Sequence, residues 1–170
     1  MPVMAILPHP VWLAGFSALM IAAAFIDLRR LVIPNPLIGG LCVLWLLDLE
    51  TSPPAISVAL ATIGCAAAVF AGGAVLFSRG LIGGGDVKLL AVASLWAGAD
   101  AVPPLLVMTA LIGGLLALFL LTPLGARIAS RRTGAAPTGS RGNGAHQAPV
   151  PYGVAIAAAA LAATLRPHFS

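Results

Sequence analysis

The sequence has very few charged residues, and this shortage excludes an ordinary soluble protein. Only 8% of its 170 residues are charged, whereas soluble domains carry about 25%. Apolar residues make up 60% of the chain, and the mean hydropathy is +1.05. Such a composition cannot cover a globule with a water-compatible surface. It indicates a single integral-membrane domain over residues 1–170, with lipid as its surroundings.

Cysteine and histidine are also scarce. Cys42 and Cys65 stand alone inside apolar stretches, without a Cys-x-x-Cys pair, so neither a disulfide framework nor a zinc site is predicted. His9, His146 and His168 lie far apart and form no ligand cluster. We therefore expect no metal ion and no cofactor. The net charge of +4 comes with basic residues in short segments between apolar runs, where they orient a membrane chain, so no nucleic-acid partner is expected.

Six apolar runs follow one another along the chain, and about 20 residues are needed to cross a bilayer. Their approximate bounds are 11–26, 36–47, 54–77, 81–99, 102–121 and 151–165. This pattern predicts an all-α, polytopic membrane protein with about six transmembrane helices. Residues 1–26 contain no Lys or Arg, unlike a cleaved signal peptide, so the first run is expected to remain as a span. Glycine pairs at 72–73 and 113–114 are typical of close helix packing in lipid.

The distribution of charge predicts the orientation of these spans. Basic residues follow the first, third and fifth runs, whereas only acids follow the second and fourth. The basic residues are Arg29, Arg30, Arg79, Arg127, Arg131, Arg132 and Arg141, and the acids are Asp48, Glu50 and Asp100. Because basic residues mark the cytoplasmic side, both the N- and C-termini should lie outside. The Gly-, Pro-, Arg- and Ser-rich stretch 127–149 then becomes a flexible cytoplasmic loop.

Two acids lie where a membrane protein normally avoids them. Asp27 ends the first apolar run, and Asp86 falls in the first turns of the fourth. A charge at the edge of hydrocarbon is costly and suggests a function. Two spans separate the acids, one leading out and one back, so both should lie on the same face. With the orientation above, that face is cytoplasmic.

Two carboxylates held close together can hydrolyse a peptide bond. They cannot both ionise cheaply, so one keeps its proton near neutral pH. The ionised carboxylate deprotonates water, and the protonated one hydrogen-bonds the scissile carbonyl; which acid takes which role is left open. Gly83 and Gly85, lacking a Cβ, would let a substrate backbone approach, and Lys88 could offset negative charge.

Each of these residues also has an ordinary structural interpretation. Asp86 could be the N-cap of its helix, Asp27 an interfacial acid beside two arginines, and Lys88 a cation reaching for the interface. The glycine run is not a phosphate-binding loop, because the Gly-Lys-Ser/Thr ending is absent.

Three segments in order resemble a known family. Residues 27–35 read Asp-Leu-Arg-Arg-Leu-Val-Ile-Pro-Asn, residues 83–89 read Gly-Gly-Gly-Asp-Val-Lys-Leu, and residues 150–157 read Val-Pro-Tyr-Gly-Val-Ala-Ile-Ala. They resemble the first aspartate motif, the GxGD motif and the Pro-Tyr-Gly segment of the type IV prepilin peptidases, in particular the small members that serve Flp/Tad pilus systems. The resemblance extends over essentially the whole chain.

The resemblance implies an intramembrane aspartic endopeptidase of the bacterial inner membrane. It would remove short basic leaders from prepilins and pseudopilins at the cytoplasmic face. Asp27 and Asp86 would be the catalytic pair, supported by Gly83, Gly85 and Lys88. The Cys-rich zinc insertion of the longer bifunctional members is missing, so methyltransferase activity is not expected. Val154 replaces a proline that is found in many members.

Two alternatives remain at this stage. Presenilin-type GxGD proteases share only the second motif, since Ile26 rather than Tyr precedes Asp27 and no Pro-Ala-Leu is present. The other alternative is a small proton-coupled transporter or assembly subunit that uses the two acids to bind protons. Acids at the bilayer midplane would favour that function.

Overall fold

The structure is a computed structural model that describes residues 10–123, 125 and 151–164. This part of the chain contains six α-helices and one short 3-10 turn. Their bounds are α1 Pro10–Arg30, α2 Asn35–Thr51, α3 Ile56–Ser78, α4 Gly84–Ala97, η1 Ala99–Ala101, α5 Val102–Leu121 and α7 Tyr152–Thr164. The predicted all-α class is confirmed, and six helices are found within the described residues, as predicted. The 127–149 stretch lies outside the described residues, and the orientation of the termini stays a prediction.

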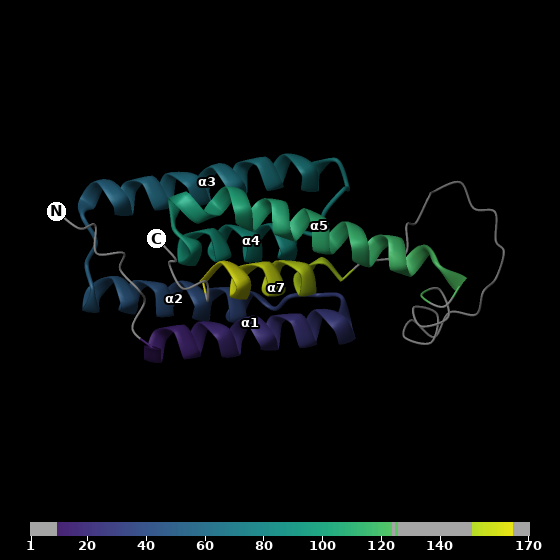
Figure 1. Cartoon of the computed structure of the whole chain (residues 1–170), viewed down its shortest axis with the longest axis horizontal. Coiled ribbons are helices and arrows are strands. Elements are labelled where there is room, and N and C mark those ends of the chain that lie inside the picture. The colour runs from purple at the N-terminus through teal and green to yellow at the C-terminus, as the bar shows by residue number, and fades with distance from the viewer. Residues whose placement is uncertain (1–9, 124, 126–150, 165–170) are drawn as a thin grey trace.

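The helices run side by side, roughly along one axis, with α3 and α1 on opposite sides of the bundle (Figure 1). Successive helices alternate in direction, so the turn after α1, the turn before α4 and the start of α7 all lie at one end. The last helix, α7, packs against α1, α4 and α5, whereas α3 packs mainly against α4. The shortest helix therefore occupies the centre of the bundle.

Three of the helical segments are long and apolar enough to cross a membrane: Val11–Arg30, Ile56–Ser78 and Ala99–Leu121. The helices α2, α4 and α7 are shorter, with 17, 14 and 13 residues. At 1.5 Å per residue, α4 is about 21 Å long, less than the hydrocarbon thickness of about 30 Å. The protein is thus a membrane protein whose described residues combine three full-length spans with three shorter helices, of which α7 lies at the centre of the bundle.

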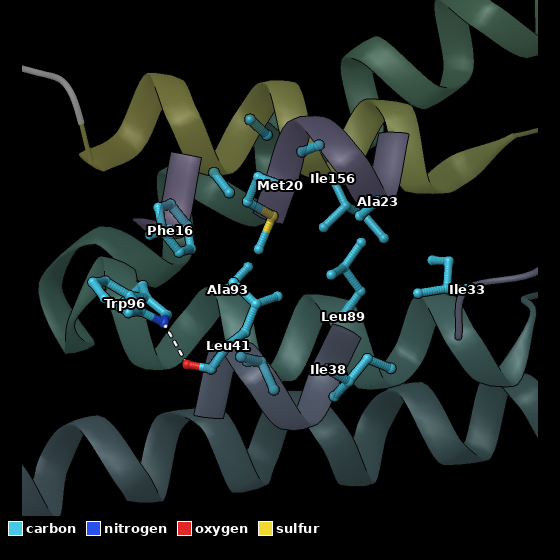
Figure 2. Close-up of a cluster of buried hydrophobic side chains, with 14 of the residues drawn as sticks. Phe16, Met20, Ala23, Ile33, Ile38, Leu41, Leu89, Ala93, Trp96 and Ile156 are labelled. Carbon is cyan, nitrogen blue, oxygen red and sulfur yellow. Dashed lines mark hydrogen bonds between the residues drawn. The ribbon is translucent and has the colours of Figure 1, made fainter. Parts of the chain in front are cut away.

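The core joins helices that are distant in sequence (Figure 2). The rings of Phe16 and Trp96 stack with centroids 4.6 Å apart, and the Trp96 indole N–H donates to the Leu41 carbonyl at 3.1 Å. Most of the inward face of α7 consists of buried alanines, including Ala155 and Ala159. Small side chains let helix backbones approach closely, which is the usual mode of packing in lipid.

Several helix ends differ from the apolar runs, because helical backbone hydrogen bonds do not stop where hydropathy falls. The helix α2 ends at Thr51 rather than at residue 47. The helix α1 continues four residues past the predicted end at residue 26 and includes Asp27, while Arg29 and Arg30 suit its C-terminal dipole. The fourth helix begins at Gly84 rather than at residue 81, so Asp86 is its third residue.

Only one member of each glycine pair lies at a close helix contact. A Cβ on Gly73 would lie 2.7 Å from Val87 Cγ1, and a Cβ on Gly113 would lie 3.1 Å from the Tyr152 ring. A Cβ on Gly72 or Gly114 would meet nothing within 4 Å. Each glycine pair therefore lies on a helix that packs closely against a neighbour, but only one glycine of the pair faces that neighbour.

We expect Gly73→Ala to destabilise the protein by about 1–3 kcal/mol, the usual cost of overpacking. Val87 is buried and β-branched, so it has little rotamer freedom with which to move away. The neighbouring Gly72→Ala is the matched control and should be neutral or slightly stabilising, since alanine favours helix. Thermal unfolding in detergent checks this, and equal melting temperatures for the two variants would contradict it.

Candidate active site

The two acids predicted from the sequence lie together at one end of the bundle. Asp27 is in the last turns of α1 and Asp86 is in the first turn of α4. Their carboxylates are close enough for the charge of Asp27 to act on Asp86. The prediction that both acids share a face agrees with this arrangement.

Asp27 is almost completely buried, with 4% of its surface exposed. Its Oδ2 accepts a hydrogen bond of 2.8 Å from the backbone N–H of Gly153, in the first turn of α7. The backbone N–H of Val154 also acts on this carboxylate. A buried carboxylate must be hydrogen-bonded to be tolerated, and here the donor comes from a helix N-terminus, where free N–H groups and the helix dipole favour an anion. Asp27 is therefore more than an interfacial acid beside two arginines.

Asp86 is partly exposed and occupies the start of α4. The N-cap is Gly83 rather than Asp86 itself, and the Asp86 carboxylate reaches back toward Gly83, whose backbone N–H favours its charged form. This is the arrangement by which the third residue of a helix reaches back to its N-cap. A Cβ on Gly83 would lie 2.9 Å from Asp86 Oδ2, so a larger residue there would displace the carboxylate.

Contacts between residues 31–35 and α4 join the first two sequence motifs. Leu31 has a φ of +54°, an uncommon conformation for a non-glycine residue, and it turns the chain back after α1. Ile33 then packs under Gly85, where a Cβ would lie 3.2 Å from the Ile33 Cβ. Beside it, the Lys88 ammonium donates to Asn35 Oδ1 at 3.0 Å. The space beside Gly83 and Gly85 is thus filled by the protein itself.

An apolar cavity of about 480 Å³ opens beside Asp86 between α3, α4, α5 and α7. Its wall includes Val69 and Gly72 from α3 and Leu106 from α5, and it reaches Tyr152 at the start of α7. Asp86 is the acid in this lining. The cavity therefore offers the Asp86 carboxylate to an apolar guest.

Sequence reasoning placed Asp27, Asp86, Gly83, Gly85 and Lys88 in one site, and the structure brings the segments that carry them together. It did not assign a role to the 151–154 segment, whose backbone contacts Asp27. The signal available was the Pro-Tyr-Gly run itself, which opens a helix of otherwise plain alanine-rich sequence. A role played by backbone N–H groups leaves no chemically reactive side chain to notice.

Comparison with known proteins agrees with the motifs. Residues 14–118 match the type IV leader peptidase family, a range that includes both acids but not the start of α7. Neither the curated proteins nor the solved structures contain a significant match to the chain. Since the matched range covers more than half of the sequence, the chain belongs to the type IV leader peptidase family.

Proposed function

We propose that this protein is an intramembrane aspartic endopeptidase that removes the short basic leader from Flp-like prepilins and pseudopilins. The observation that carries the proposal is that Asp27 at the end of α1 and Asp86 at the start of α4 lie within electrostatic range of each other, beside an apolar cavity. Membership of a leader peptidase family supports the same reaction class. Neither a cofactor nor methyltransferase activity is part of the proposal.

The proposed reaction uses the two carboxylates as a general base and a general acid. The ionised carboxylate takes a proton from water while the water oxygen attacks the scissile carbonyl carbon. The protonated carboxyl donates to the carbonyl oxygen, which gives a neutral tetrahedral diol. As the C–N bond breaks, one proton returns to the leaving amine, and a second passes from a diol hydroxyl to the pair. The products are the leader carboxylic acid and the new N-terminal amine.

The cytoplasmic location of the site is supported by the charges at the two ends of the bundle. Arg29, Arg30 and Arg79 lie at the end with the two acids, whereas Glu50 and Asp100 lie at the other. Basic residues are retained on the cytoplasmic side during insertion. A basic leader that has not crossed the inner membrane would meet the site from this side.

The cavity supports an apolar segment next to the scissile bond. Its lining is almost wholly apolar, and Asp86 lies at its wall. A hydrophobic substrate helix could thus place its first side chains in the cavity while its peptide bond faces the carboxylates. A proton-coupled transporter would instead favour acids at the midplane, whereas Asp27 lies in the last turns of α1 and Asp86 in the first turn of α4.

Asp27→Asn and Asp86→Asn should each abolish cleavage, since an amide can neither accept the water proton nor donate as a carboxylic acid. The expected loss is at least about 100-fold, the lower range for general acid–base catalysis. Membranes with the enzyme and a candidate prepilin are analysed by mass spectrometry of the prepilin N-terminus. Glu50→Gln and Asp100→Asn serve as controls at the opposite end. Full cleavage by either Asp variant would refute the catalytic pair.

Gly72→Leu should impair cleavage by filling the cavity. A side chain at residue 72 starts in open space on the cavity wall, so the variant should fold while competing with the substrate. We expect kcat/KM to fall about tenfold, equivalent to about 1.4 kcal/mol. Gly64→Leu is the matched control on the same helix, because Gly64 also has open space but does not line the cavity. If Gly72→Leu kept the wild-type kcat/KM, the proposal that the substrate occupies this cavity would be wrong.

The proposed orientation predicts which single cysteines react from outside the cell. In a background with Cys42 and Cys65 replaced by Ser, Asp100→Cys should react with a membrane-impermeant maleimide on intact spheroplasts. Arg79→Cys should react only after the membrane is opened. Both positions are exposed, so access rather than burial decides the result. The opposite labelling pattern would place the acids on the outer face.

A further inference from the structure

The start of α7 contacts Asp27 directly, although 126 positions separate Gly153 from Asp27 in the sequence. We propose that the backbone N–H of Gly153 positions the Asp27 carboxylate for catalysis, which makes Gly153 a positioning residue of the active site. This inference rests on the proposed function, since it concerns how one of the two proposed catalytic acids is held. The proposed active site would then include the start of α7, in addition to the end of α1 and the start of α4, which carry the two carboxylates.

The hydrogen-bond geometry commits one oxygen of Asp27 to α7. The Gly153 N–H donates to Oδ2 at 2.8 Å in a buried environment, and the Val154 N–H is close enough to favour the carboxylate electrostatically. A helix N-terminus carries a partial positive charge, and its first N–H groups lack partners within the helix. The start of α7 therefore holds the Asp27 carboxylate through its Oδ2 atom.

Space also requires a glycine at this position. A Cβ on Gly153 would lie 2.8 Å from Oδ2, 2.9 Å from Cγ and 3.0 Å from Cβ of Asp27. Real Cβ atoms essentially never approach heavy atoms this closely, so any larger residue must push the carboxylate away. Gly153 does not belong to the glycines with positive φ. Its role is therefore close approach, not an unusual backbone conformation.

The start of α7 is itself held firmly, so it can act as a fixed reference for the carboxylate. Gly153, Ala155 and Ile156 are buried, and α7 packs on three other helices. The Tyr152 ring lies against Gly113 of α5, where a Cβ would come within 3.1 Å of the ring. Asp27 is thus positioned by the bundle core, not by a loop.

The first test is the kinetics of Gly153→Ala in the full-length enzyme in detergent. Displacing a catalytic group by about 1 Å costs about 100-fold in rate, so we expect kcat to fall about 100-fold with KM little changed. Gly114→Ala on α5 is the control, because an added Cβ there meets nothing within 4 Å. A purely structural role would lower the melting temperature but leave kcat of the folded enzyme near wild type, and that result would overturn the proposal.

A second test needs no activity and still works if Gly153→Ala fails to fold. Tyr152 is the chain's only tyrosine, so labelling Tyr carbonyls with ¹³C and Gly amides with ¹⁵N selects the Gly153 amide alone. A charge-assisted hydrogen bond to Asp27 should shift its amide proton downfield. In Asp27→Ala the signal should move upfield, whereas in Asp100→Asn it should stay. An unchanged signal in Asp27→Ala would overturn the proposal.

The two sets of variants separate this proposal from the proposed function. Loss of cleavage in Asp27→Asn and Asp86→Asn, together with wild-type kcat in Gly153→Ala, leaves the peptidase intact and removes only the positioning role. Cleavage that survives both Asn variants removes the peptidase, whatever the amide signal shows.

Discussion

One hydrogen bond, from the Gly153 N–H to the Asp27 carboxylate, connects the first and last described helices at the point where the chemistry is proposed to occur. Without a donor, a carboxylate as buried as Asp27 would be strongly unfavourable in this apolar bundle. No side chain in the alanine-rich helix α7 could replace the backbone donor without adding bulk where space is lacking. The contact ties the end of α1 to the start of α7, the helix that packs on α1, α4 and α5.

The rest of the site is built from short-range contacts between backbone and small residues. Leu31 turns the chain at the end of α1, which lets Ile33 pack under Gly85 and Asn35 accept from Lys88. Backbone strain of this kind is commonly found near functional sites. These contacts fix the first turn of α4 relative to α1 and so set the relation between the two acids. Glycines at 83 and 85 are needed because Asp86 and Ile33 fill the space beside them.

The lengths of the helices suit a site that must meet both water and an apolar substrate. The helices α4 and α7 are each too short to cross the hydrocarbon, and both begin at the end of the bundle with the acids. Irregular backbone at membrane depth is tolerated where protein surrounds it, and Pro151, just before α7, is buried. The longer helices α1, α3 and α5 present many large apolar side chains outward, for example Ile21, Ile63 and Leu115. Lipid contact thus falls mainly on these longer helices, although α1 also carries Asp27, whose side chain is buried against the start of α7.

Composition and order along the chain were enough to predict an all-α membrane protein, its six helices and the shared face of Asp27 and Asp86. These properties depend on local hydropathy and on the number of membrane spans between Asp27 and Asp86. Both can be counted directly along the sequence. The family was predictable for the same reason, since Asp27, Asp86 and the glycines before Asp86 lie within short segments. The ends of α1 and α4 were less predictable, because helical hydrogen bonds continue or stop independently of hydropathy.

Only the tertiary structure decided which residues each acid and each glycine contacts. The contact of Gly153 with Asp27 spans 126 positions and uses a backbone N–H, which every residue except proline possesses. The choice of Gly73 over Gly72, and of Gly113 over Gly114, depends on which face of a helix meets its neighbour. The cavity beside Asp86 likewise arises from four helices at once. Local sequence could determine which residues carry charge and which segments are helical, but the packing of the bundle determined what each charge and each glycine touches.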